Sequence, residues 1–125
     1  MHELSVAHAV VSTVVEALPA GPSAPRVLEV HVRVGVLSGV VPDALSYAYD
    51  VAAEGTPLAD AALHVERSPV VIHCAECDGD AELLGTTDFR CPACGTPSGD
   101  VRGGRELEVL RLVLDDAPAL AGGMP

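Results

Sequence analysis

The chain has 125 residues, which is enough for one domain, or for one domain with a small insertion. Hydrophobic residues make up 49% of it and aromatic residues only 2%, so Val, Leu and Ala must form the core. Seven basic and eighteen acidic residues give a net charge of −11, which disfavours nucleic-acid partners. No run approaches the ~20 apolar residues of a membrane span, and the N-terminus does not resemble an export signal. We therefore expect a soluble cytoplasmic protein with no membrane partner.

The first predicted element is an amphipathic helix from Glu3 to Leu18. Its apolar residues recur at steps of three and four along one face: Leu4, Ala7, Val11, Val14 and Leu18. A loop rich in Pro, Gly and Ser follows at residues 20–25. The next segment alternates apolar and polar residues, which predicts a strand with one buried face formed by Leu28, Val30, Val32 and Val34.

A second helix is predicted from Pro42 to about Ala53, because Pro suits a first helical position and residues 55–57, Gly-Thr-Pro, end a helix. Its expected inward residues are Leu45, Ala48, Tyr49 and Ala52. Strands at 62–67 and 70–73 then lead into a cysteine-rich segment that ends in a flexible run, residues 98–105. The last strand, around residues 107–114, has apolar residues on both faces, which is typical of a central strand.

Four cysteines, Cys74, Cys77, Cys91 and Cys94, form two C-x2-C pairs separated by thirteen residues. Disulfides are not expected in the cytosol, and this spacing is typical of a tetrahedral Zn(II) site. Four thiolates leave no open coordination position, so the site is interpreted as structural. Zinc would also substitute for a core in a segment with few large apolar side chains. Rubredoxin-like iron, a redox dithiol and free cysteines remain alternatives.

These elements together predict an α/β (α+β) fold, in which two helices pack on a small sheet and a zinc-ribbon module is inserted before the last strand. Residues 1–72 and 105–116 are predicted to form a discontinuous α/β domain, and residues 73–104 a zinc-ribbon domain. Residues 117–125 contain Pro and Gly without periodicity and are expected to be a flexible tail.

The N-terminus offers a different kind of metal site. The terminal amine, the His2 backbone nitrogen and the His2 imidazole can form fused chelate rings on one ion. In-plane nitrogen ligands of this kind suit Ni(II) or Cu(II) better than Zn(II). The residues alone also allow His2 to be an ordinary solvated residue.

The other histidines carry weaker signals, and surface or packing roles are expected for His8, His31 and His64. His73 directly precedes Cys74, but four cysteines already complete a zinc shell. The role of His73 is left open.

Three motifs together resemble the HypA/HybF family of nickel metallochaperones for [NiFe]-hydrogenase maturation. They are the N-terminal Met-His-Glu-Leu-Ser, the run Arg-Val-Gly-Val-Leu-Ser-Gly-Val at 33–40 followed by Pro42, and the paired C-x2-C motifs. The resemblance extends over roughly residues 1–115 and includes the order of helices and strands.

The resemblance implies a non-enzymatic nickel carrier. His2 would bind Ni(II) together with the backbone nitrogens of Met1 and His2, and Glu3 would tune the site or contribute its backbone nitrogen. The four cysteines would bind structural Zn(II). The implied partners are a HypB-type GTPase and the large subunit of [NiFe]-hydrogenase, and a homodimer is possible. Urease is a second possible client.

Two other classes of function compete with this interpretation. The first is a zinc-ribbon module that binds protein or nucleic acid and has no nickel function, and the acidic charge counts against its nucleic-acid form. The second is a hydrolase. The sequence lacks a convergent acid, base and nucleophile, which counts against this class.

Overall fold

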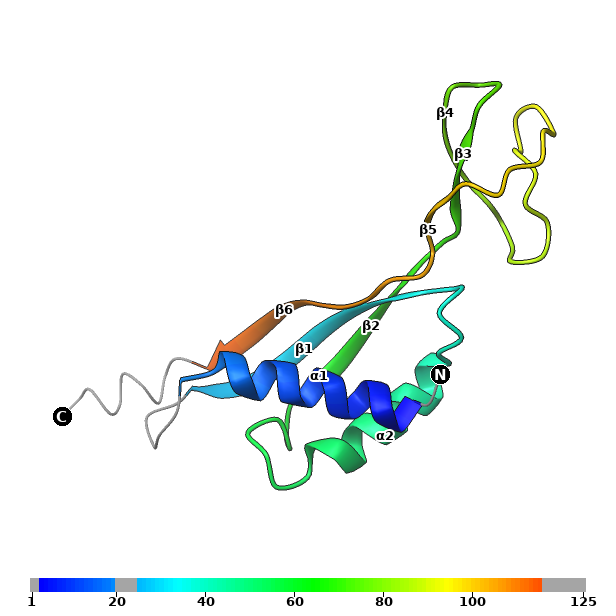
Figure 1. The fold of residues 1–125 in the computed structure, drawn as a ribbon. Coiled ribbons are helices and arrows are strands. Elements are labelled where there is room, and N and C mark those ends of the chain that lie inside the picture. Colours follow the sequence, from blue (N-terminus) through cyan, green and yellow to red (C-terminus); the bar gives the residue numbers. More distant parts are fainter. Residues whose placement is uncertain (1–2, 20–24, 116–125) are drawn as a thin grey trace.

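The computed structural model describes residues 3–19 and 25–115, which form two helices and two three-stranded sheets (Figure 1). The larger sheet and both helices lie at one end of an elongated molecule, and the smaller sheet lies at the other. Residues 20–24 of the predicted loop and the predicted tail at residues 117–125 lie outside the described residues. Neither described helix is long and apolar enough to cross a membrane.

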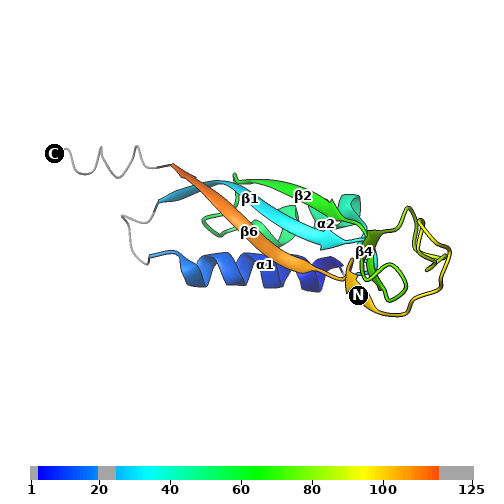
Figure 2. The same cartoon turned by 90° about the horizontal axis from the view of Figure 1, so that it is seen from above.

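The larger sheet has the strand order β2-β1-β6. The central strand β1 (Arg26–Gly35) is parallel to β2 (Ala62–Ser68) and antiparallel to β6 (Leu107–Asp115). A parallel pair needs a crossover connection, and α2 (Pro42–Ala53) supplies it. The first helix, α1 (Glu3–Ala17), packs beside α2, and both helices cover one face of the sheet (Figure 2).

One hydrophobic core lies between the helices and this face of the sheet. Its largest fully buried side chains are Tyr49, Leu45, Leu58, Val14, Val27, Val30, Val32 and Val34. The stripe predicted for α2 is confirmed, because all four of its residues are buried. Burial of branched aliphatic side chains supplies most of the driving force in a core this poor in aromatic residues.

The stripe predicted for α1 is wrong at one position. Val6 is buried, whereas Leu4 is 44% exposed. The helix is rotated so that the flank carrying Val6 and Val10 faces Val32 and Val109 of the sheet. Leu4 lies on the other flank, and helical spacing alone does not distinguish the two flanks.

The alternation predicted for β1 also breaks at its start. Val27 is buried and Leu28 is 38% exposed, although Val30, Val32 and Val34 point inward as expected. The register with β6 shifts between Val27 and Glu29, so Leu28 is an extra residue in a β-bulge. A bulge reverses the side-chain alternation on either side of it.

The last strand, β6, lies at an edge of the sheet and not at its centre as predicted. A second register shift leaves Leu110 without a partner in β1, between Val109 and Arg111. This bulge places Val109 and Leu112 on the same face, where both pack against the core. The two-sided apolar pattern therefore comes from a bulge and not from burial of both faces.

The smaller sheet has the order β4-β3-β5 and is antiparallel throughout. Its strands are β3 (Val71–Cys74), β4 (Gly79–Glu82) and β5 (Val101–Gly103), which lie between β2 and β6 in the sequence, as predicted for an insertion. Val70, Ile72 and Leu83 form a separate small core, against which Val36 and Leu37 pack.

The flexible run predicted at residues 98–105 is wrong, because it contains β5. The Ser98 hydroxyl donates to the His73 carbonyl oxygen at 2.6 Å, and the His73 backbone N–H donates to the Asp100 carbonyl at 2.9 Å. Hydrogen bonds to β3 therefore order a segment whose composition is that of a loop.

Candidate metal centre

The four cysteines come from the tips of two hairpin-like turns. Cys74 ends β3, and Cys77 lies in the turn that leads into β4. The second pair, Cys91 and Cys94, lies in a turn flanked by an isolated bridge between Arg90 and Pro97. Each C-x2-C segment thus curls back on itself, which presents two sulfur atoms on the same side.

The backbone of each turn favours this curl. Asp78 (φ 52°) and Gly95 (φ 78°), which directly follow the two pairs, both have left-handed conformations. The Gly95 N–H donates to the Cys91 carbonyl at 2.7 Å, and the Cys91 N–H donates to the Thr96 carbonyl at 2.9 Å. Asp and Gly tolerate the left-handed region better than other residues, so both residue types suit these positions.

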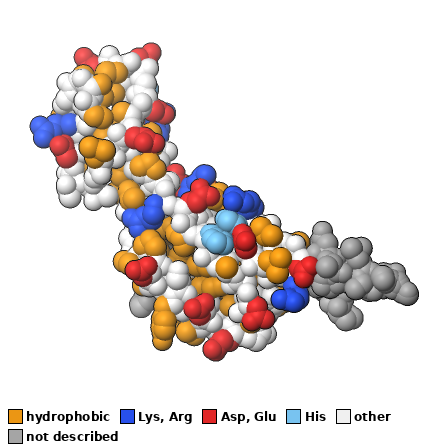
Figure 3. Space-filling model, turned by 180° about the vertical axis from the view of Figure 1, so that it is seen from behind, with side chains coloured by type: hydrophobic (Ala, Val, Ile, Leu, Met, Phe, Trp, Pro, Cys, Tyr) orange, Lys and Arg blue, Asp and Glu red, His pale blue; other side chains and the backbone are white. Residues whose placement is uncertain are grey.

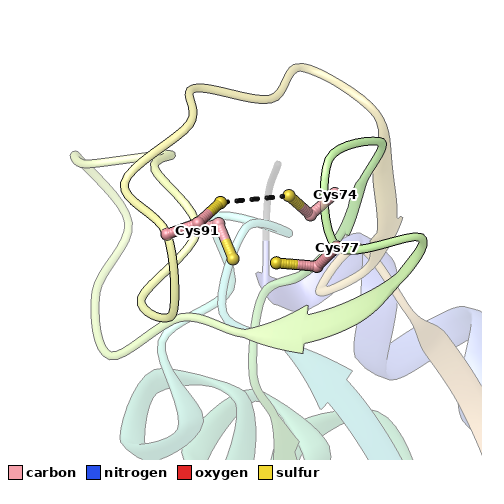
Figure 4. Close-up of side chains that lie close together, drawn as sticks. Cys74, Cys77 and Cys91 are labelled. Atoms are coloured by element: carbon pink, nitrogen blue, oxygen red, sulfur yellow. Dashed lines mark hydrogen bonds between the residues drawn. The ribbon is translucent and has the colours of Figure 1, made fainter.

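The turns bring all four sulfur atoms together, each within 4.8 Å of the others. Figure 4 shows the side chains of Cys74, Cys77 and Cys91 directed toward a common centre. The Sγ atoms of Cys74 and Cys94 are 3.5 Å apart. In a tetrahedral site with Zn–S bonds of about 2.3 Å, two sulfur atoms lie about 3.8 Å apart. The cluster therefore has the size and donor set that one zinc ion requires.

Protons are shared unequally among the four crowded sulfur atoms. Hydrogen bonds from the Thr96 hydroxyl and backbone N–H lower the pKa of Cys94 to about 6. Hydrogen bonding with Cys94, then with Cys74 and Cys91, raises the pKa of Cys77 to about 12. Four crowded sulfur atoms thus share protons, because they cannot all ionise without a positive charge between them. A divalent ion supplies that charge and displaces the protons.

His73 does not join this cluster. Neighbouring residues on a strand face opposite sides, and Cys74 faces the sulfur cluster. The His73 Nδ1 atom instead lies 3.0 Å from Asp80 Oδ1 on the paired strand β4. In the part of the chain that the structure describes, this histidine belongs to an exposed ion pair and to no metal-binding group.

The start of α1 is anchored to the start of α2. Glu3, in the first turn of α1, accepts a hydrogen bond through Oε2 from the backbone N–H of Val41 at 3.2 Å. Val41 is the N-cap of α2 and has no side-chain cap, so the carboxylate lies where a negative charge is favoured. Met1 and His2, predicted as nickel ligands, lie outside the described residues.

One group of potential ligands was not anticipated from the sequence. Glu29, His31 and His64 lie together on the uncovered face of the larger sheet. Surface or packing roles were expected for His31 and His64, and their grouping with Glu29 was not predicted. The parallel register of β1 and β2, which brings the two histidines together, has no local signal in the sequence.

A zinc-ribbon cysteine cluster beside an α/β domain defines a metal-binding protein, and comparison with known proteins gives its family. The family model described as "Hydrogenase/urease nickel incorporation, metallochaperone, hypA" matches residues 1–114. The hydrogenase maturation factor HypA of Chloroflexus aurantiacus is 46% identical over 112 residues, covering 90% of this chain and 97% of the relative. The corresponding protein of Roseiflexus is 43% identical over 116 residues, covering 93% and 94%.

A solved structure supports the same fold. The solution structure of the Ni metallochaperone HypA from Helicobacter pylori superposes with a TM-score of 0.59 at 20% identity, covering 91% of this chain and 97% of that one. The chain belongs to the HypA family of nickel-incorporation metallochaperones. Membership confirms the resemblance predicted from the three motifs, and it displaces the alternative of a zinc-ribbon module without nickel function.

Proposed function

We propose that this protein binds Ni(II) through its N-terminal residues and delivers the ion for [NiFe]-hydrogenase maturation, while zinc held by four cysteines is structural. The observation that carries the proposal is the family match, which begins at residue 1 and so includes the Met-His-Glu terminus. The protein acts in this proposal as a carrier and not as a catalyst.

The proposed nickel ligands are the Met1 amine, the His2 backbone nitrogen and the His2 imidazole. Fused chelate rings of this kind impose an in-plane nitrogen geometry, which suits a square-planar Ni(II) ion. Each nitrogen must lose a proton to bind, so nickel affinity depends on pH. Glu3 tunes the site in this proposal, through its charge or through its backbone nitrogen.

The contact between Glu3 and Val41 supports a positioning role for this residue. The carboxylate joins the first turn of α1 to the N-cap of α2. The peptide that carries the proposed nickel ligands therefore continues directly from a helix end that is tied to the folded domain. A fixed attachment lowers the entropy that the ligands lose on binding the ion.

Zinc has a different task in this proposal. Ligation by Cys74, Cys77, Cys91 and Cys94 would complete a tetrahedral shell and leave no position for a cargo ion. The smaller sheet has only a small apolar core of its own. Zinc therefore stabilises the module, and nickel is carried elsewhere on the chain.

Delivery requires partners. The sequence has no glycine-rich phosphate loop, so we assign nucleotide hydrolysis to a HypB-type GTPase that docks with this chain. The recipient is the [NiFe]-hydrogenase large subunit, and urease is a second candidate client, because nickel incorporation by this family concerns both enzymes. The proposed site of action is the cytoplasm. A homodimer of this chain is compatible with the proposed role.

Nickel titration of three forms of the zinc-loaded protein tests the proposal. The native chain is compared with a form that has a few residues added before Met1 and with His2→Ala, each checked for zinc content. Extension converts the terminal amine into a peptide nitrogen, and His2→Ala removes the imidazole. Both variants should therefore lose the tight nickel equivalent and keep their zinc. Unchanged nickel affinity in the extended form would place the tight site elsewhere and overturn the proposal.

A further inference from the structure

The uncovered face of the larger sheet carries a group of three side chains that have the donor atoms of a metal site. Glu29 and His31 lie two residues apart on β1, so both face the same side of the sheet. His31 is directly opposite His64 in the parallel register of β1 and β2. Figure 3 shows histidine side chains gathered with acidic and basic ones on the face away from the helices.

The distances within this group suit a single ion. Glu29 Oε1 lies 2.7 Å from His31 Nε2 and 3.6 Å from His64 Nε2. Two ligands bound at about 2.0 to 2.1 Å, at angles between square and tetrahedral, lie about 2.9 to 3.4 Å apart. The two observed separations lie just outside that range, one on either side of it, so the side chains must rotate to bind one ion.

The environment allows these rotations. The two imidazole rings stack with their centroids 4.5 Å apart and their planes 14° apart. The His64 side chain is 49% exposed, while that of His31 is 13% exposed and is held by Glu29. His31 and Glu29 are therefore hydrogen-bonded to each other, and the more exposed His64 has more room to turn its Nε2 atom toward them.

We propose that Glu29, His31 and His64 form a second metal site, which takes a late first-row divalent ion such as Ni(II). Imidazole nitrogen suits nickel, copper and zinc, and two imidazoles with one carboxylate also occur together as a ligand set for zinc. Three ligands at a solvent-exposed surface leave coordination positions for water or for an incoming ligand. The site is therefore exchangeable, in contrast to the closed shell of four cysteines.

The neighbouring charges on this face are paired with one another. Arg111, directly opposite His31 on β6, lies 3.9 Å from Glu66, and Arg33 lies 3.1 Å from Glu108. Each arginine thus has an acidic partner, which reduces its repulsion of a bound cation. The Glu29 carboxylate supplies the negative charge inside the group itself.

This inference does not depend on the proposed nickel site at the N-terminus. It is tested in zinc-loaded His2→Ala protein, which lacks the N-terminal imidazole, by calorimetric titration with Ni(II). One weaker equivalent should remain, and His64→Gln or His31→Gln in the same background should remove it. His8→Gln is the matched control, because His8 is exposed on α1 and belongs to no ligand group among the described residues.

Proton spectra of the histidine rings provide the second readout. Ni(II) should perturb the His31 and His64 ring signals together, and at a lower Ni(II) concentration than it perturbs the ring signals of His8 and His73. The substitutions should leave the melting temperature of the protein unchanged. Equal nickel binding by the His2→Ala protein and its His64→Gln derivative would overturn the inference, as would no binding by either. Neither result affects the N-terminal site, which is tested by extending the chain with His64 intact.

Discussion

Gly35, the last residue of β1, lies so close to Gly104 that a Cβ atom on Gly35 would be 2.1 Å from the Gly104 carbonyl oxygen. That carbonyl accepts a hydrogen bond from the Leu37 backbone N–H at 2.7 Å. The chain returning from the smaller sheet therefore crosses the end of β1 in direct backbone contact. Only a residue without a side chain fits at this junction.

Gly35→Ala should lower the free energy of unfolding by about 1 to 3 kcal/mol, because the added methyl group must displace backbone atoms. The measurement is urea denaturation followed by circular dichroism. Gly85→Ala is the matched control, since a Cβ there meets no atom within 4 Å. Equal stability of the two variants would contradict the close contact.

Glu106 connects the end of β2 to the segment around Gly104 and should make the stability of the protein depend on pH. Its carboxylate accepts hydrogen bonds from the Ser68 hydroxyl at 2.6 Å and from the Gly104 N–H at 2.9 Å. The Ser68 hydrogen bond is the main cause that lowers the pKa of Glu106 below its ordinary value of 4.5. The stabilisation is therefore complete above that ordinary value and is lost as the pH falls through the lowered one.

Glu106→Gln should cost about 1 kcal/mol at neutral pH. The free energy of unfolding of this variant should also decrease less than that of the native chain as the pH falls below 4.5. The reason is that the variant has no carboxylate to protonate at this position. Urea titrations at a series of pH values measure both effects. An acid dependence as steep as that of the native chain would show that Glu106 does not contribute to it.

Local patterns predicted much of this fold and of the zinc cluster. Pro42 and the stripe from Leu45 to Ala52 specify α2, and the two C-x2-C pairs specify the sulfur cluster. Each of these signals is contained in a short stretch of sequence. The errors arise where a distant partner decides the outcome. Leu28 and Leu110 lie in bulges that are defined only by the register of β1 against β6.

The same reasoning explains the ligand group that the sequence did not reveal. His31 and His64 are thirty-three positions apart in the sequence (64 − 31), and only the parallel pairing through α2 brings their rings together. The order of residues 98–105 likewise depends on hydrogen bonds to β3. Amino-acid composition predicts neither the pairing of β1 with β2 nor the hydrogen bonds to β3.

Removal of zinc should unfold the smaller sheet selectively. We expect zinc-free protein, or Cys91→Ala, to lose amide protection across residues 74–104, because the core around Ile72 is too small to replace the metal. Protection in β1 and α2 should persist. Hydrogen exchange followed by mass spectrometry measures both regions, and uniform loss across the chain would instead indicate a single folding unit.

The two proposed roles of the Glu3 side chain, its charge and its anchoring contact with Val41, can be separated by substitution. Glu3→Gln keeps an oxygen that can accept the Val41 hydrogen bond but removes the charge, whereas Glu3→Ala removes both. If anchoring dominates, Gln should retain nickel affinity better than Ala, and if charge dominates, both should weaken it equally. Nickel titration of the zinc-loaded variants decides between them, and native affinity in Glu3→Ala would exclude both roles.

The most direct test of the central claim is nickel transfer. The native chain and the N-terminally extended chain are each mixed with one equivalent of Ni(II). A HypB-type GTPase, GTP and the nickel-free hydrogenase large subunit are then added, and the nickel content of the large subunit is measured over time. The native chain should transfer nickel faster than free Ni(II) at the same concentration, and the N-terminally extended chain should give no such gain. Equal transfer by the native and extended chains, or no gain over free nickel, would contradict the account.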